Sequence, residues 1–279
     1  MTMVQEVEVL VTGFGPYPDG HGGQIDPNTS YTLTQMMPPV LEPRTAQNPS
    51  ATRIRIVRPP TGYVPTEYRA IRQFCHDLHR RRDENENKEG KAAAAALIVH
   101  LGEARGLWDS HVTVERCAFK QGMTSNFWDA VGVPRNQRYY AVPDAVGEVA
   151  DDLGPCPWGA DVPVGLQTVL DVDAVADKAR GILKTGALFR GSKGSSTDRE
   201  LGGKVATPLG IRPHMEAGFY GCGFIYYESL AGCYVRGRRP NVLFCHVPGK
   251  EDAHSLAGAR DAVLAVIVAA VDEVERGDN

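Results

Sequence analysis

The sequence predicts a single three-layer α/β/α sandwich whose central sheet is mostly parallel. Short β-rich or apolar runs alternate with segments of helical spacing along the chain, and alternating strands and helices build parallel sheets that are covered on both faces. Neither an internal repeat nor a linker divides the sequence. We therefore expect one domain over residues 1–279, with loop insertions at residues 82–91 and 191–203.

The expected elements follow from local patterns in chain order. A β-rich run stops at Gly13, a loop follows, and Asp26 with Pro27 has the pattern of a helix N-cap followed by proline. Strands are expected at residues 7–12, 52–57, 92–101, 111–115, 205–211 and 241–247, and helices at residues 66–81, 172–183, 223–235 and 252–276. The Pro-, Gly- and Trp-containing stretch 122–165 predicts long loops or a lid.

Three segments have patterns that constrain them further. Residues 92–101 are apolar throughout, as a strand covered on both faces is. The next strand alternates, with His111, Thr113 and Glu115 on one face and two valines on the other, which is the period of a half-buried strand. Residues 82–91 hold no apolar side chain to bury, so an exposed loop is expected there.

Composition excludes several classes of protein. The 279 residues are 42% hydrophobic and carry a formal net charge of -4, which fits a soluble protein with a full apolar core. The sequence has no long run of basic residues, so nucleic-acid binding is not expected. The apolar runs at 92–99 and 262–271 are shorter than the ~20 residues that cross a bilayer, and residues 1–10 lack the charge layout of a secretory signal. We expect a cytoplasmic protein that contacts no membrane, with its oligomeric state left open.

The glycine loop after the first strand does not predict a cofactor site. Gly13 and Gly15 begin a G-x-G-x-x-G pattern, but its third glycine would fall at Pro18, where no helix opens. The loop also lacks the Gly-Lys-Ser/Thr end of a phosphate-binding loop. It is either a tight turn or, through Phe14 and Tyr17, the wall of a pocket. No cofactor and no metal are expected.

Cys222 is the strongest candidate nucleophile. The six cysteines are widely spaced without a Cys-x-x-Cys pair, which indicates free thiols. Cys222 lies between two glycines at the apparent start of a helix, where backbone N–H groups stabilise a thiolate. The competing interpretation of any single cysteine is a small buried hydrophobe. Cys117, Cys233 and Cys245 fit that structural interpretation.

Two further side chains complete a possible set for cysteine acyl transfer. His246 ends a buried strand, where ligand sites collect in α/β sheets, although a lone histidine there is also compatible with a core role. Glu115 closes a polar strand face, where a glutamate is commonly solvated or paired with a base such as Arg116. A thiol, an imidazole and a carboxylate together meet the chemical requirements of acyl transfer.

Five segments carry a family resemblance. Residues 9–17, VLVTGFGPY, resemble the opening of the pyroglutamyl peptidase I family, also called pyrrolidone carboxyl peptidases. HLG at 100–102 and VER at 114–116 resemble that family's glycine loop and glutamate strand. EAGFYGC at 216–222 is similar to its D-A-G-x-Y-x-C helix start, as found in fungal-type members, and LFCHVP at 243–248 is similar to its histidine segment.

The resemblance implies roles for particular residues. By it, Cys222 is the nucleophile, His246 the general base and acid, and Glu115 the carboxylate that orients the imidazole. Two aromatic residues would enclose the lactam ring of an N-terminal pyroglutamate. The implied substrate-binding residues are Phe14, Gly15, Tyr17 and Glu103.

The sequence also departs from the family pattern. Glu103 stands where many members have glutamine, and Ser125 stands where bacterial members carry an arginine near the active site. The resemblance predicts a cysteine peptidase that removes N-terminal pyroglutamate from peptides through a thioester. One alternative is a cysteine hydrolase or acyltransferase with the same triad that acts on another small cyclic amide or acyl substrate. A second alternative is a non-catalytic binding protein on the same fold.

Overall fold

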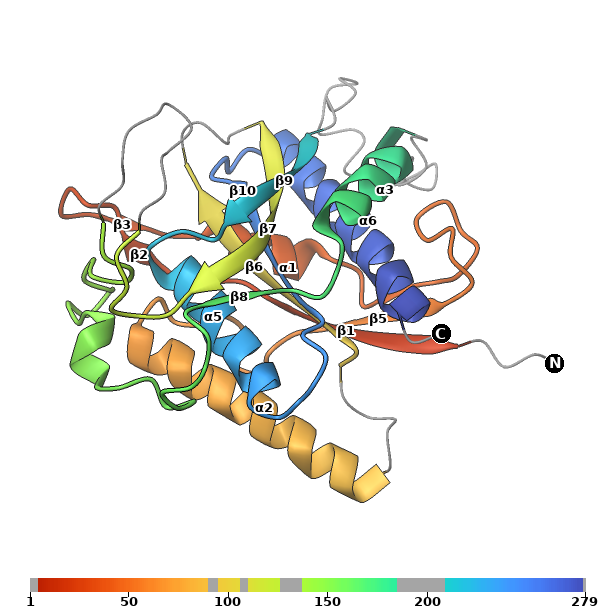
Figure 1. Cartoon of the computed structure of the whole chain (residues 1–279). Coiled ribbons are helices and arrows are strands. Elements are labelled where there is room, and N and C mark those ends of the chain that lie inside the picture. Colours follow the sequence, from red (N-terminus) through yellow and green to blue (C-terminus); the bar gives the residue numbers. More distant parts are fainter. Residues whose placement is uncertain (1–4, 90–94, 106–109, 126–136, 185–208, 278–279) are drawn as a thin grey trace.

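A mixed eight-stranded sheet forms the centre of the computed structural model, which describes residues 5–89, 95–105, 110–125, 137–184 and 209–277 (Figure 1). Its strands are β1 (Glu6–Thr12), β4 (Val40–Leu41), β5 (Arg53–Val57), β6 (Leu97–Ala104), β7 (His111–Phe119), β8 (Gly165–Gln167), β9 (Gly210–Glu216) and β10 (Val242–Pro248). They are ordered β4-β5-β1-β6-β10-β7-β8, and β9 also pairs with β7. A separate ribbon joins β2 (Tyr17–Pro18) to β3 (Gln24–Ile25).

Strand directions bring the carboxyl ends of the central strands to one edge of the sheet. β5, β1, β6 and β10 run parallel to one another, β7 runs antiparallel to β10, and β9 runs parallel to β7. In this register His246 of β10 lies opposite Gly102 of β6 and Thr113 of β7. On the other side of β7, Glu115 lies opposite His214 of β9.

Helices cover both faces of the sheet, so the predicted three-layer α/β sandwich is confirmed. Helices α1 (Thr29–Met36), α3 (Val172–Lys184) and α6 (Ala253–Gly277) pack on one face, and α2 (Tyr68–Glu89) and α5 (Gly221–Tyr234) pack on the other. In Figure 1, α2 and α5 lie at the bottom, whereas α3 and α6 lie at the upper right. A short 3-10 helix, Ala150–Leu153, interrupts the loop region that was expected over residues 122–165.

Two helices are apolar for reasons of burial. In α5 every residue from Gly221 to Cys233 is buried except Cys222, which is partly exposed, and a helix enclosed in this way is apolar on all sides. α6 is long and apolar enough to span a membrane by composition, and 72% of its most apolar 18-residue window is buried inside the molecule. Its packing against the sheet and against the neighbouring helices α1 and α3 accounts for that composition.

The expected loop over residues 82–91 is wrong for residues 82–89, because α2 continues to Glu89. Lysine, arginine and glutamate have high helix propensity, and ion pairs along a helix stabilise it further. Arg80 pairs with Glu84 one turn further along α2, and Asp83 pairs with Arg236 and Arg238 beyond the end of α5. These pairs replace the apolar contacts that the segment lacks.

Two other expectations need correction. α1 begins at Thr29 after the N-cap Asn28, whose side chain accepts from the Ser30 N–H, so Asp26 and Pro27 precede the helix instead of opening it. The strand expected at 205–211 lies at Gly210–Glu216. The expected insertion at 191–203 falls outside the described residues.

Candidate active site

Cys222 occupies the first turn of α5, at the carboxyl edge of the parallel strands. The N-cap residue Tyr220 is extended and makes no side-chain capping bond, and the first N–H groups of a helix have no partner within it. Two positions near the thiol, Gly223 and Gly102, leave no room for a side chain. A Cβ at Gly223 would lie 2.1 Å from the Gly218 carbonyl oxygen, and one at Gly102 would lie 2.7 Å from the Cys222 Sγ.

His246 lies between the thiol and a carboxylate. Its Nδ1 is 2.9 Å from Glu115 Oε1, and a second hydrogen bond joins its ring to the Cys222 thiol. Since Nδ1 faces a carboxylate acceptor, Nδ1 carries a proton. With Nδ1 bonded to Glu115, Nε2 is the ring nitrogen left for the thiol. Burial by itself would lower the pKa of His246, but its interactions with Cys222 and Glu115 outweigh burial and raise that pKa. The contacts of His246 therefore favour its protonated, imidazolium form.

Glu115 is fully buried and accepts three hydrogen bonds from side chains. Thr113 Oγ1 and His246 Nδ1 both bond Oε1, at 2.6 and 2.9 Å, and His214 Nδ1 bonds Oε2 at 2.6 Å. Burial would raise the pKa of Glu115, but the bonds from the two histidines outweigh it and lower that pKa. Glu115 is therefore an ionised carboxylate inside the protein.

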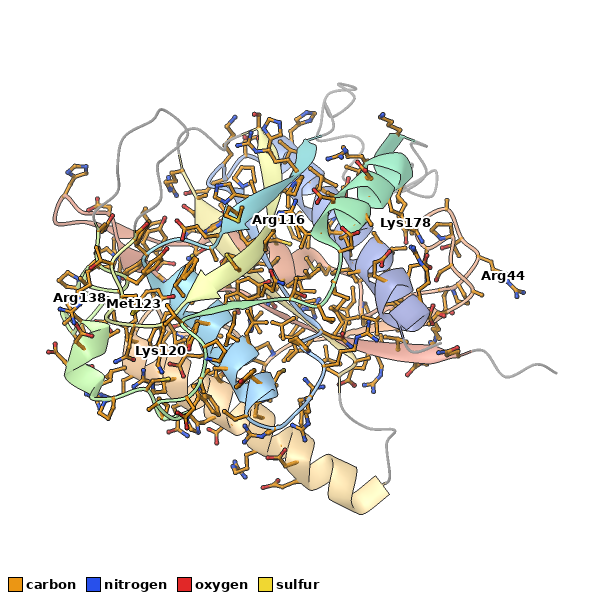
Figure 2. The ribbon with its side chains drawn as sticks, viewed as in Figure 1. Arg44, Arg116, Lys120, Met123, Arg138 and Lys178 are labelled. Atoms are coloured by element: carbon orange, nitrogen blue, oxygen red, sulfur yellow. The ribbon has the colours of Figure 1, made fainter. Side chains whose placement is uncertain are left out.

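The pairing of Glu115 with Arg116, weighed from the sequence, does not occur. Neighbouring residues of a strand point to opposite faces of the sheet. Arg116, labelled in Figure 2, pairs with Asp173 of α3 on the face opposite α5. Glu115 instead accepts from Thr113 and the two histidines.

His214 is the residue of this cluster that the sequence did not reveal. It lies on β9 directly opposite Glu115, and its bond to that carboxylate raises its pKa against the effect of burial. The strand expected at 205–211 stops before His214, so the sequence pattern places this side chain on neither face of the sheet. The local signal for it is weak, since only the strand order brings it to Glu115.

A small pocket opens beside the thiol. Its lining consists of Phe14, Tyr17, Asn28, Thr66, Glu103, Tyr220, Gly221 and Cys222. Three of the four predicted substrate-binding residues thus share one pocket with Cys222. Asn28, Thr66 and Tyr220 were not predicted to line it.

Gly15, the fourth of these residues, has a role in the backbone of the loop. Its N–H donates to the Val64 carbonyl, and its own carbonyl accepts from Asn28 Nδ2 and Thr66 Oγ1. A Cβ there would lie 2.5 Å from the Tyr63 ring. Both backbone groups are thereby bonded to the protein itself, so Gly15 shapes the pocket through its neighbours.

Glu103 accepts hydrogen bonds from three residues at the pocket. Its carboxylate accepts from the Tyr17 hydroxyl at 3.0 Å, from the N–H and hydroxyl of Thr29 at 2.8 and 2.9 Å, and from Arg105. Thr29 begins α1, where a carboxylate is stabilised by the helix N-terminus. Glu103 consequently fixes Tyr17 and the start of α1 around the pocket.

The remaining cysteines lie in less reactive surroundings. Burial is the largest cause raising the pKa of the thiols of Cys75, Cys117, Cys156, Cys233 and Cys245. Ser125, which stands at the family's arginine position, is buried and hydrogen-bonded to Tyr139. In the described part of the chain, no group of three or more His, Cys, Asp or Glu side chains is arranged to hold a metal ion.

Fold and site together define an α/β protein that carries a thiol, an imidazole and a carboxylate at the carboxyl edge of a mostly parallel sheet. Its fold is similar to that of pyrrolidone carboxyl peptidases. The enzyme from Thermococcus litoralis superposes with a TM-score of 0.57 at 16% identity, over 97% of this chain and 96% of that chain.

Two more solved structures show the same likeness. A mutant pyrrolidone carboxyl peptidase from Pyrococcus furiosus gives a TM-score of 0.57 at 16% identity, over 96% of this chain and 99% of the other. The enzyme from Thermus thermophilus gives 0.50 at 21% identity, over 95% and 99%. No protein-family model matches the sequence, and no curated protein sequence matches it. At these identities the likeness establishes the fold.

Proposed function

We propose that this chain is a cysteine peptidase that removes pyroglutamate from the N-terminus of peptides through a thioester intermediate. The observation that carries the proposal is the continuous chain of contacts from the Cys222 thiol through the His246 ring to the buried Glu115 carboxylate. That chain supplies a nucleophile, a proton carrier and a group that fixes the carrier's tautomer.

Acylation uses each of these groups once. The Cys222 thiolate attacks the pyroglutamyl carbonyl carbon, and a C–S bond forms as the carbonyl π electrons move to oxygen. His246, protonated on both ring nitrogens at that moment, gives its Nε2 proton to the departing peptide amine as the C–N bond breaks. Glu115 stays ionised and stabilises the imidazolium.

In deacylation His246 acts as a base and regains a proton. His246, now neutral, takes a proton from water through Nε2, and the resulting hydroxide attacks the thioester carbon. Collapse of the tetrahedral intermediate breaks the C–S bond and releases free pyroglutamate, which regenerates the thiolate and imidazolium pair. N–H groups in the first turn of α5 are suited to bind the oxyanion of both steps, a type of contact worth roughly 2.7–4 kcal/mol per donor.

The pocket beside the thiol is suited to a small, flat acyl group of a substrate. Phe14 and Tyr17 offer aromatic surface against which a lactam ring can pack. Tyr17 is held by its bond to Glu103, so the pocket is shaped before substrate binds. Pre-organisation of this kind reduces the entropy lost on binding.

A panel of fluorogenic amides tests the proposal. Pyroglutamyl, prolyl and glutaminyl amides of one fluorophore are incubated with the wild-type protein and with Cys222→Ala. We expect turnover of the pyroglutamyl amide by the wild type and none by the variant, whose smaller side chain leaves the fold intact. Equal turnover by the two proteins would contradict the assignment of Cys222.

One observation favours a second candidate function. Glu103 can accept but not donate hydrogen bonds, so it lacks the amide donor that glutamine would offer a lactam carbonyl. The second candidate is a cysteine hydrolase or acyltransferase for another small cyclic amide or acyl group. Turnover of a different ring in preference to pyroglutamate would select this second candidate.

A binding protein on the same fold is the remaining alternative. It would bind such a ring without turnover, and its Cys222 would resist alkylation.

A further inference from the structure

Glu115 lies on the middle strand of three, with a histidine on each side. The register of β9, β7 and β10 places His214 directly opposite Glu115 and His246 opposite Thr113. His246 takes Oε1 of the carboxylate and His214 takes Oε2. Both oxygens therefore have an imidazole partner, and the ring of His246 is also hydrogen-bonded to the Cys222 thiol.

The proton on His214 can be located from its neighbours. Its Nδ1 lies 2.6 Å from Glu115 Oε2 and 3.1 Å from the Glu216 carbonyl oxygen. Since both are acceptors, Nδ1 must carry the hydrogen. His214 is thus a donor to Glu115 in either of its protonation states.

We propose that His214 is a positioning residue for the reaction: it holds Oε2 of Glu115 so that Oε1 stays directed at His246. The inference rests on the proposed function of Cys222 and His246 described above. His214 acts through Glu115 and is not among the described residues that line the pocket beside the thiol.

The carboxylate needs such a partner for two reasons. The terminal torsion of a glutamate is broad and roughly two-fold, so bonds to Oε1 alone leave the carboxylate plane poorly fixed. Glu115 is also fully buried, and a buried charged oxygen that loses its donor is destabilised. Without His214 the carboxylate is expected to turn toward another donor and to weaken its bond to His246.

The test compares variants at position 214 in the full-length protein. His214→Ala removes the donor, whereas His214→Asn keeps an N–H group close to the position of Nδ1. His111→Asn is the matched control, because His111 lies on the face of β7 that carries Glu115 but hydrogen-bonds Ser110. Each protein is assayed for kcat and KM on the pyroglutamyl amide and for the rate of Cys222 alkylation by iodoacetamide, followed on the Cys222 peptide by mass spectrometry.

We expect His214→Ala to lower kcat and the alkylation rate by about tenfold, the size expected for a lost bond to a charged group, while KM changes little. His214→Asn should recover both rates to within about threefold of wild type, and His111→Asn should match wild type. If His214→Ala does not fold, His214→Leu takes its place, and the inference then requires His214→Asn to exceed it.

Wild-type rates in folded His214→Ala, or no gain of His214→Asn over the variant without a donor, would overturn the inference. The alkylation assay separates this result from the proposed function, because it needs no substrate. If the wild type does not turn over pyroglutamyl amides but alkylation still depends on the donor at 214, the proposed function fails and the role of His214 stands. If Cys222 of the wild type is no more reactive than Cys222 of His214→Ala while the wild type still turns over the pyroglutamyl amide, the role of His214 fails and the proposed function stands.

Discussion

Three side chains, those of Thr113, His246 and His214, donate hydrogen bonds to the two oxygens of Glu115. A carboxylate can accept every one of these bonds, whereas an isosteric amide can accept on one side only. The site therefore depends on the charge and the acceptor capacity of this residue as much as on its shape.

Replacing Glu115 by Gln is expected to keep the fold and slow the chemistry. The amide NH₂ must face a donor hydrogen of either His246 or His214, which displaces that ring or changes its tautomer. We expect kcat to fall by about 10²–10⁴, the upper end being the cost of a wrong tautomer in a related triad. His246→Ala should be nearly inactive. Steady-state assays of the three proteins check this, and an unchanged kcat in Glu115→Gln would show that the carboxylate does not orient His246.

Glu103 allows a second test at the residue scale. Glutamine at this position can accept on one oxygen only, so it cannot keep the bonds from Tyr17, Thr29 and Arg105 together. We expect Glu103→Gln to raise KM for pyroglutamyl amides about tenfold through loss of a charge-assisted bond that holds Tyr17, with a smaller effect on kcat. A lower KM would show that Glu103 disfavours the lactam, and would support the second candidate substrate class.

At the scale of elements, the start of α5 depends on close backbone approach. A Cβ at Gly223 would lie 2.1 Å from a backbone oxygen of Gly218, which cannot move without shifting the turn before Cys222. By contrast, a Cβ at Gly221 would make ordinary contacts of 3.4 Å or more with Ile71, Thr66 and Phe14. These two glycines therefore form a matched pair.

We expect Gly223→Ala to lower the free energy of unfolding by about 1–3 kcal/mol, which is typical of overpacking. Gly221→Ala should be neutral or stabilising by up to about 1 kcal/mol, because alanine has the higher helix propensity. Urea denaturation of both variants provides the comparison. Equal stabilities would mean that the turn at Gly218 adapts freely and that the thiol is not held by this contact.

The elements also show which parts of the structure are readable from local sequence. The buried strands β1, β6 and β10 and the helices α3, α5 and α6 were predicted because apolar runs and helical spacing are local properties. The extension of α2 was missed because Asp83 is held by Arg236 and Arg238, which are far away in the chain. His214 was missed for the same reason, since strand order decides which residue faces Glu115.

The candidate site was predicted to a similar extent. Cys222, His246 and Glu115 were found by residue type at strand and helix ends, and the structure brings them into contact. Gly15 was predicted to bind substrate, but its backbone groups are bonded within the protein. The pocket residues Asn28 and Thr66 come from separate loops, and nothing in their local sequence indicates that they share a pocket.

At the scale of the whole molecule, charged side chains such as Arg44 and Arg138 lie at the periphery (Figure 2), whereas several histidines are enclosed. His79 is fully buried between α2 and α5, where its ring lies against Gly232 and its Nε2 bonds the Ser229 carbonyl. Burial, reinforced by nearby arginines, lowers the pKa of His79 to about 3. The folded protein therefore keeps this ring neutral at pH values where the unfolded chain protonates it.

This difference makes stability depend on pH in a defined direction. Because the folded-state pKa lies below the unfolded value of about 6.5, stability is fully present above pH 6.5 and is lost as pH falls toward 3, by about 1.4 kcal/mol per pH unit. His79→Gln keeps a donor for the Ser229 carbonyl but does not titrate. We expect the variant to gain about 1.4 kcal/mol relative to wild type between pH 7.5 and pH 5.5 in urea denaturation. A pH-independent difference would show that folding does not lower the pKa of His79.

Trapping the acyl-enzyme tests the central claim most directly. The wild-type protein is mixed with excess pyroglutamyl amide, quenched with acid within the first turnovers, digested, and analysed by mass spectrometry, with Cys222→Ala treated in parallel. The account predicts one pyroglutamyl group attached to the peptide that contains Cys222, absent from the variant and lost when the wild-type reaction proceeds to completion. Free pyroglutamate formed without a modified Cys222 peptide, or a pyroglutamyl group on another residue, would contradict it.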